Sequence, residues 1–232
     1  MLGRLRKISR KVFYPVAKLV GSLGVKPNLI TLFGLLVASV GGLLLIFRFP
    51  ILAAFCFLAS GVLDLLDGLV ARIYGKKTKF GGTLDAVVDR YEEFIMVAAS
   101  AIGRYVSWPI ATFAVFSMIA PSYVRARAES TGGMKKCDVG FLERPEKLLF
   151  VVLAIVGLIF YPMALDVAFI LIIVLGQITV VQRLAATFNF EKSRVNKVAR
   201  KVLRRNKTGV VNEKSSIRVS LDKKQLHDVS LE

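Results

Sequence analysis

The sequence predicts an all-α integral membrane protein, with six transmembrane helices preceded by an amphipathic helix at the membrane interface. Hydrophobic residues make up 55% of the 232 residues, and several apolar runs approach or exceed the ~20 residues that a helix needs to cross a bilayer. Backbone polar groups inside a bilayer must be satisfied internally, which favours helices. Lys and Arg are concentrated in alternate connections between the apolar runs, as expected of a multi-pass protein.

Residues 1–26 form a basic juxtamembrane segment ahead of the first apolar run. Within residues 3–22, basic and apolar side chains are mixed in the manner of an interfacial amphipathic helix. Pro27 then stands near the first position of the next helix, where proline is favoured. Asn28 and Thr31 follow it and are suited to capping that helix.

The six spans are predicted within a membrane domain that covers residues 27–190. By length and apolar content they occupy residues 28–47, 50–73, 82–103, 108–128, 145–161 and 164–186. The remainder, 191–232, divides into a basic surface helix at 192–207 and a polar tail that is expected to be disordered.

The distribution of charge predicts the orientation of the chain in the membrane. The loops on one side carry only Arg48 and Arg104, whereas both termini and the other loops are rich in Lys and Arg. The positive-inside rule therefore places both termini on the cytoplasmic side of the plasma membrane. The net charge of +17 fits anionic membrane lipids and phosphorylated substrates better than nucleic acid.

The rare reactive side chains exclude several kinds of chemistry. Cys56 lies in an apolar run and Cys137 in a polar loop, so neither a disulfide nor a cysteine metal site is expected. The single histidine, His227, lies in the polar tail, which excludes Ser-His and Cys-His catalysis and a histidine-bound zinc. Any catalysis must therefore use carboxylates.

Four aspartates lie at or inside the second and third apolar runs. Asp64 with Asp67, and Asp85 with Asp89, are spaced so that each pair lies on one face of a helix. Facing pairs of carboxylates suit hard cations, which predicts a site for two Mg²⁺ or Mn²⁺ ions. The alternative is that they are helix-end charges, solvated or paired with nearby arginines, but ionisable residues inside a membrane usually have a function.

A phosphate-binding region is predicted around these acids. Gly68 and Ala71 leave space beside the first pair, and Arg72 offers a planar guanidinium to phosphate oxygens. Thr78 and Gly81 lie in the connection that leads to the second pair. Together these residues indicate a diphosphate site.

The full pattern runs Asp64-x-x-Asp67-Gly68-x-x-Ala71-Arg72, eight residues, then Gly81-x-x-x-Asp85-x-x-x-Asp89. It resembles the signature of the CDP-alcohol phosphotransferases, whose fixed positions are all present. The resemblance implies a membrane enzyme that moves a phosphatidyl-type group from a CDP-lipid to an alcohol and releases CMP. It also implies that the four aspartates bind two metal ions, that Asp89 acts as the base, that Asn28 and Thr31 lie near the CDP group, and that the protein is a homodimer.

Further cations are predicted to gather near the same membrane face, at the ends of the later spans: Arg125, Arg127, Arg144, Lys147 and Arg183. They would form a pocket for a phosphorylated second substrate, although the positive-inside rule alone would also place charges there. The surrounding stretches resemble those of the inositol-phosphate-using synthases within the family. That resemblance implies that inositol 1-phosphate binds Arg125, Arg127, Lys147 and Arg183, with lysine at 147 where arginine is expected.

Two alternatives to this function stay open at the level of sequence. The same family core could use another acceptor, such as glycerol 3-phosphate, which would give phosphatidylglycerol phosphate. A non-enzymatic cation transporter could also use four acids, but the runs before Asp64 and after Asp89 are almost wholly apolar, which argues against a conduction path. The lipid tails could be diacylglycerol or archaeol, because both need only an apolar groove.

Overall fold

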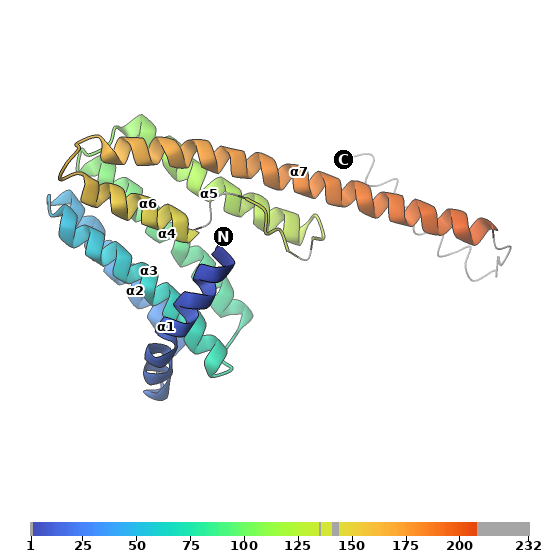
Figure 1. Cartoon of the computed structure of the whole chain (residues 1–232), viewed down its shortest axis with the longest axis horizontal. Coiled ribbons are helices and arrows are strands. Elements are labelled where there is room, and N and C mark those ends of the chain that lie inside the picture. The colour runs from blue at the N-terminus through green and yellow to red at the C-terminus, as the bar shows by residue number, and fades with distance from the viewer. Residues whose placement is uncertain (1, 135, 141–143, 208–232) are drawn as a thin grey trace.

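The computed structural model describes residues 2–134, 136–140 and 144–207, which form seven α-helices and no strand (Figure 1). The all-α expectation is confirmed. The helices are α1 (Leu2–Ser22), α2 (Pro27–Ile46), α3 (Pro50–Ile73), α4 (Lys79–Ile102), α5 (Trp108–Ser130), α6 (Arg144–Gly157) and α7 (Ala164–Lys207).

The helices pack as two connected groups. Helix α2 lies against both α3 and α4, and α1 packs on α3, while α5 lies along α7 (Figure 1). Helix α6 contacts both α3 and α7, and α4 contacts α5, so these pairs join the two groups. The larger apolar core, which includes the fully buried Phe169 and Ile172 and the nearly fully buried Phe57, fills the space between them.

A smaller apolar core fixes the part of α3 that carries the first two aspartates. Ala17 of α1 and Ile30 of α2 are buried against Leu66, Leu69 and Val70 of α3. These α3 residues alternate with Asp64 and Asp67 along the helix, so their burial directs the acidic face of α3 away from this core.

The chain is a multi-pass membrane protein. Within the described ranges, α2, α3 and the Ala164–Lys197 part of α7 are long and apolar enough to cross a membrane. Large apolar side chains are exposed along the helices, including Leu29, Phe33, Leu36, Phe55 and Phe113, which fits contact with lipid tails. The expected span at 145–161 is shorter than predicted, because α6 ends at Gly157 after 14 residues.

The helices expected at 164–186 and 192–207 are not separate in the structure. Helix α7 continues without a break for 44 residues. No glycine or proline occurs between Gly176 and Lys207, so nothing in the backbone chemistry interrupts the helix. The predicted disordered tail lies outside the described residues.

The start of α4 is fixed by a helix cap. The Thr78 side chain accepts a hydrogen bond from the Gly81 N–H at 2.9 Å. A Cβ added to Gly81 would lie 3.0 Å from Asn28 Oδ1, so the first turn of α4 approaches the first turn of α2 closely. This contact brings the aspartates of α4 into the same region as those of α3.

Candidate active site

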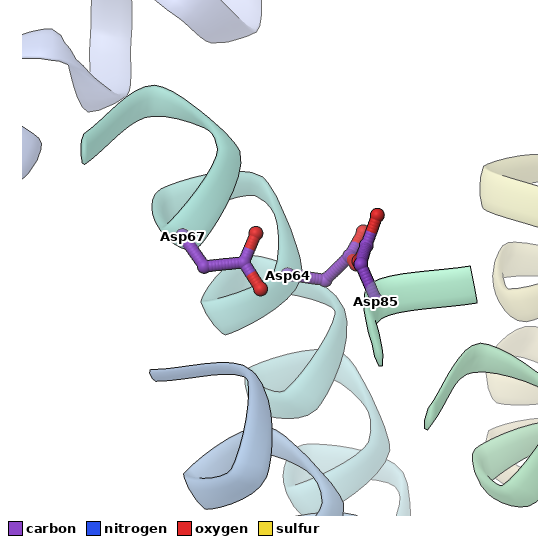
Figure 2. A group of neighbouring side chains, drawn as sticks. All are labelled: Asp64, Asp67 and Asp85. Atoms are coloured by element: carbon purple, nitrogen blue, oxygen red, sulfur yellow. The ribbon is translucent and has the colours of Figure 1, made fainter. Parts of the chain in front are cut away.

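Three of the four aspartates converge between α3 and α4. Figure 2 shows Asp64 and Asp67 extending from one helix toward Asp85 on the other. One carboxylate oxygen from each of the three lies within 4.8 Å of the others. Asp67 is only 5% exposed, so these acids are drawn together in a partly water-excluded place.

Asp89 lies one turn further along α4 and is held by two arginines. Its Oδ2 is 3.4 Å from Arg90 Nη2, and its Oδ1 pairs with Arg144 Nη1. Arg144 also pairs with Asp64, at 2.5 Å, and with Glu92. One guanidinium at the start of α6 therefore joins carboxylates from both α3 and α4.

The acidic cluster fits a divalent cation. Oδ1 of Asp85 is buried and accepts no hydrogen bond from any described residue, although it lies among several carboxylates. An ion among these oxygens would offset the repulsion between them, and carboxylate oxygens suit Mg²⁺ and Mn²⁺. Thr31 donates a hydrogen bond to Oδ2 of Asp67, which orients that carboxylate from α2.

The residues expected to bind the CDP group lie together in one cleft of about 210 Å³ beside the cluster. Helix α2 contributes its first turn, α3 its last turns, and α4 its cap and first turns. Asp67 and Asp85 belong to the acidic cluster and also line this cleft. The lining includes Asn28, Thr31, Gly68, Ala71, Arg72, Thr78 and Gly81.

A second cleft, of about 530 Å³, opens on the acidic cluster and is lined by further cations. Its lining includes Arg125 of α5 together with Lys136 and Asp138 of the segment that follows α5. It also shares Asp67, Gly68, Arg72 and Asp85 with the first cleft. The carboxylates thus lie where two ligands, one in each cleft, would meet.

The structure separates the other cations that the sequence grouped with Arg125. Arg127 is exposed on α5 and is not among the described residues that line either cleft. Lys147 is 4% exposed, lies 2.5 Å from Glu93 and donates to the Met118 carbonyl at 3.0 Å. Arg183 is 6% exposed and donates to the carbonyls of Val139, at 2.8 Å, and Pro121.

Two groups of residues were not singled out as site residues from the sequence. Lys136 and Asp138 lie in the cleft only because the segment after α5 folds back toward α3, which no local pattern indicates. Glu92 and Glu93 are buried beneath the cluster, where Glu92 accepts from Ser60 at 2.7 Å and Glu93 pairs with Arg90 at 3.1 Å. Their position three and four residues after Asp89, on the same face of the helix, was the one available signal.

Glu129, near the end of α5, makes two contacts that hold the second cleft together. Glu129 accepts the Cys137 N–H at 2.9 Å and pairs with Arg125 Nε at 3.0 Å. The Cys137 N–H, followed by the Arg125 guanidinium, holds the pKa of the Glu129 carboxyl below its usual value. Glu129 therefore carries a negative charge that fixes both Arg125 and the segment around Cys137.

Comparison with known proteins supports an enzymatic role for this site. The chain is 34% identical over 185 residues to the archaetidylinositol phosphate synthase of Methanothermobacter thermautotrophicus, which covers 79% of this chain and 92% of that protein. It is 36% identical over 191 residues to the phosphatidylinositol phosphate synthase of Corynebacterium glutamicum, covering 77% and 85% of the two chains.

Solved structures show the same fold. The phosphatidylinositol phosphate synthase of Mycobacterium tuberculosis with CDP-DAG bound superposes with a TM-score of 0.68 and 29% identity, over 77% of this chain and 94% of that one. The same enzyme in complex with manganese and citrate gives a TM-score of 0.67 and 30% identity, over 75% and 88%. The family model for CDP-alcohol phosphatidyltransferases matches residues 25–209. The chain therefore belongs to the CDP-alcohol phosphatidyltransferase family.

Proposed function

We propose that this enzyme transfers a diradylglycerol-phosphate group from a CDP-lipid to inositol 1-phosphate. The products are a phosphatidyl- or archaetidyl-inositol phosphate and CMP, which places the reaction in phospholipid biosynthesis. The observation that carries the proposal is the meeting of two clefts at one acidic cluster, one with the nucleotide-type residues and one with Arg125 and Lys136. The names of the relatives supply the identity of the acceptor.

Asp64, Asp67, Asp85 and Asp89 would hold two ions of Mg²⁺ or Mn²⁺. Bound there, the ions would offset the charge of the diphosphate and of the departing CMP. A relative solved in complex with manganese supports a divalent cation of this kind.

Cationic side chains in the two clefts would bind the phosphates of the two substrates. Arg72, beside the closely approached Gly68, binds the diphosphate in the first cleft. Arg125 and Lys136 bind the acceptor's phosphate in the second, with Arg127, Lys147 and Arg183 as further candidates from the family resemblance.

The proposed bond changes take Asp89 as the base, as the family resemblance implies. Asp89, held by Arg90 and Arg144, accepts the proton of the inositol hydroxyl. The resulting oxygen bonds to the lipid-side phosphorus, and the bond from that phosphorus to the CMP oxygen breaks.

We also propose that α2 to α7 contribute six spans within residues 27–190, with both termini and the site on the cytoplasmic side of the plasma membrane. The concentration of Lys and Arg at the ends of α1, α3, α5 and α7 supports this orientation. The exposed apolar faces of the helices leave area for both lipid and a second copy in a homodimer.

The test is CMP release by purified protein in detergent, with Mn²⁺ and CDP-diacylglycerol or CDP-archaeol. Inositol 1-phosphate is compared with free inositol, glycerol 3-phosphate and serine, and Asp89→Asn serves as the inactive control. Release that requires inositol 1-phosphate supports the proposal. Release with glycerol 3-phosphate instead would favour the alternative acceptor, because Arg125 and Lys136 recognise a phosphate rather than a ring. If none of the acceptors gives CMP release, the result contradicts the proposal.

A further inference from the structure

Arg125 and Lys136, two of the cations that line the second cleft, pair with the same carboxylate of the chain. Arg125 Nη2 lies 3.1 Å from Oδ1 of Asp138, and Lys136 pairs with Oδ2 of the same residue. All three residues line the cleft that opens on Asp64 and Asp85. Asp138 thus offers one oxygen to each cation, as two oxygens of a phosphate group would.

Asp138 is held at this position by its neighbours. Cys137 has no exposed surface, and its backbone N–H is bound by Glu129 at the end of α5. Glu129 also pairs with Arg125 Nε, so one carboxylate fixes both the segment and the arginine. Val139, on the other side, accepts a hydrogen bond from the buried Arg183. The contacts on both sides keep the Asp138 carboxylate at the cleft.

We propose that Asp138 is a specificity-determining residue that occupies the anion position of the acceptor cleft until a phosphate displaces it. A phosphate monoester brings a charge of about −1.5 to −2 and three strong acceptor oxygens, against the single charge of a carboxylate. It therefore competes successfully for Arg125 and Lys136. A neutral alcohol meets cations that already pair with Asp138 and Glu129, and it gains no ion pair from them. The identity of the acceptor as inositol 1-phosphate rests on the proposed function, but the anion competition does not.

The exposure of these pairs makes the competition possible. The side chains of Arg125 and Asp138 are 38% and 43% exposed, so water screens their attraction and the pair is weak. The pair between Lys147 and Glu93 is different, because these side chains are 6% and 5% exposed. A ligand can replace the first pair at little cost, whereas separating the second would leave buried charges unpaired.

The experiment measures anion binding directly. Isothermal titration calorimetry of the full chain in detergent, without CDP-lipid, compares wild type with Asp138→Asn, using inorganic phosphate and then inositol 1-phosphate. The variant should bind both ligands roughly twofold to tenfold more tightly, because a competing charge has been removed, and the gain should shrink at high salt. A merely structural role for Asp138 would weaken binding. Asp166→Asn, an aspartate at the start of α7, is the matched control and should bind as wild type does.

Equal or weaker binding by Asp138→Asn would overturn the inference, and so would the absence of measurable phosphate binding in both proteins. Asp138→Ala should also raise the affinity. Because alanine cannot hydrogen-bond the ligand, this result would show that the loss of the charge, and not a new contact from the asparagine amide, is the cause. CMP release by wild type separates this inference from the proposed function. If inositol 1-phosphate gives no product while Asp138→Asn still binds phosphate more tightly, the proposed acceptor is wrong and the anion competition stands.

Discussion

The guanidinium of Arg144 pairs with the carboxylate of Asp64, with Nη1 2.5 Å from Oδ1. Arg144 opens α6 and Asp64 lies on α3, so the pair joins two helices that are far apart in the sequence. The same guanidinium reaches Asp89 and Glu92. Arg144, which the sequence grouped with the acceptor-binding cations, therefore offsets repulsion among the candidate metal ligands.

This arrangement predicts opposite effects of Arg144→Gln on two properties. Without Mn²⁺, the variant should unfold at a lower temperature, because the crowded carboxylates lose their cation. It should also bind Mn²⁺ several-fold more tightly, because a competing charge is gone. Electron paramagnetic resonance of free Mn²⁺ measures the affinity, with Arg104→Gln on an exposed loop as the control. Weaker Mn²⁺ binding would mean that Arg144 positions the ligands rather than competing for them.

Removal of a proposed metal ligand should abolish catalysis together with metal binding. Asp64→Asn and Asp85→Asn each take one charge from the cluster, and CMP release should fall at least about 100-fold. Chelation with EDTA should stop wild type to the same extent, and added Mn²⁺ should restore wild type alone. Asp166→Asn keeps the chemical change but lies outside the cluster, so it should respond as wild type does. Full activity of either cluster variant would remove that aspartate from the metal site.

The hydrogen bond from Thr31 to Asp67 predicts a stability difference between two substitutions at position 31. Valine has nearly the same shape but no donor, so Thr31→Val should lower the free energy of unfolding by about 1.5–3 kcal/mol, the usual range for a hydrogen bond to a charged group. Thr31→Ser keeps the hydroxyl and should lose much less. Chemical unfolding in detergent micelles compares the two. Equal losses would show that the methyl packing, and not the donor, is what matters.

The buried pair between Lys147 and Glu93 predicts a non-additive effect. Lys147→Met leaves Glu93 buried without one of its two cations and should cost about 3–5 kcal/mol of unfolding free energy. The double variant Lys147→Met with Glu93→Gln removes both charges and should be more stable than the single variant. A double-mutant cycle by thermal unfolding measures the coupling. A double variant that is less stable by the sum of the single effects would contradict the pairing.

Substitutions of Arg125 and Arg183 should change different properties: the first should weaken acceptor binding, and the second should lower stability. Arg125 lies in the open cleft, so Arg125→Gln should raise the KM for the phosphorylated acceptor about tenfold with little change in stability. Arg183 is buried and satisfies two backbone carbonyls, so Arg183→Gln should lower the unfolding temperature. Steady-state CMP release and thermal unfolding are measured on both variants. A raised KM at unchanged stability in Arg183→Gln would return that residue to the acceptor site.

The spacing of residues along the chain was enough to predict the acidic cluster and the cleft beside it. Asp64 and Asp67 share a helical face because of the period of the α-helix, and Asp85 meets them because the segment from Arg72 to Gly81 is too short to separate α3 from α4 widely. The CDP residues follow for the same reason, since all except those of α2 lie in that one continuous stretch. The sequence by itself thus determined the all-α membrane class, the acidic cluster and the cleft lined by the residues expected to bind CDP.

Which of the later cations line the second cleft was decided only by the tertiary structure. Arg125, Arg144, Lys147 and Arg183 look alike in the sequence, because each is a cation near the end of an apolar run. Packing gave them different environments: one lies in the open cleft, one lies among the carboxylates, and two are buried against Glu93 and backbone carbonyls. Whether a cation binds a substrate or holds helices together depends on which groups surround it. Those neighbours come from α3, α4 and α5 and from the segment after α5, which only the folded chain brings together.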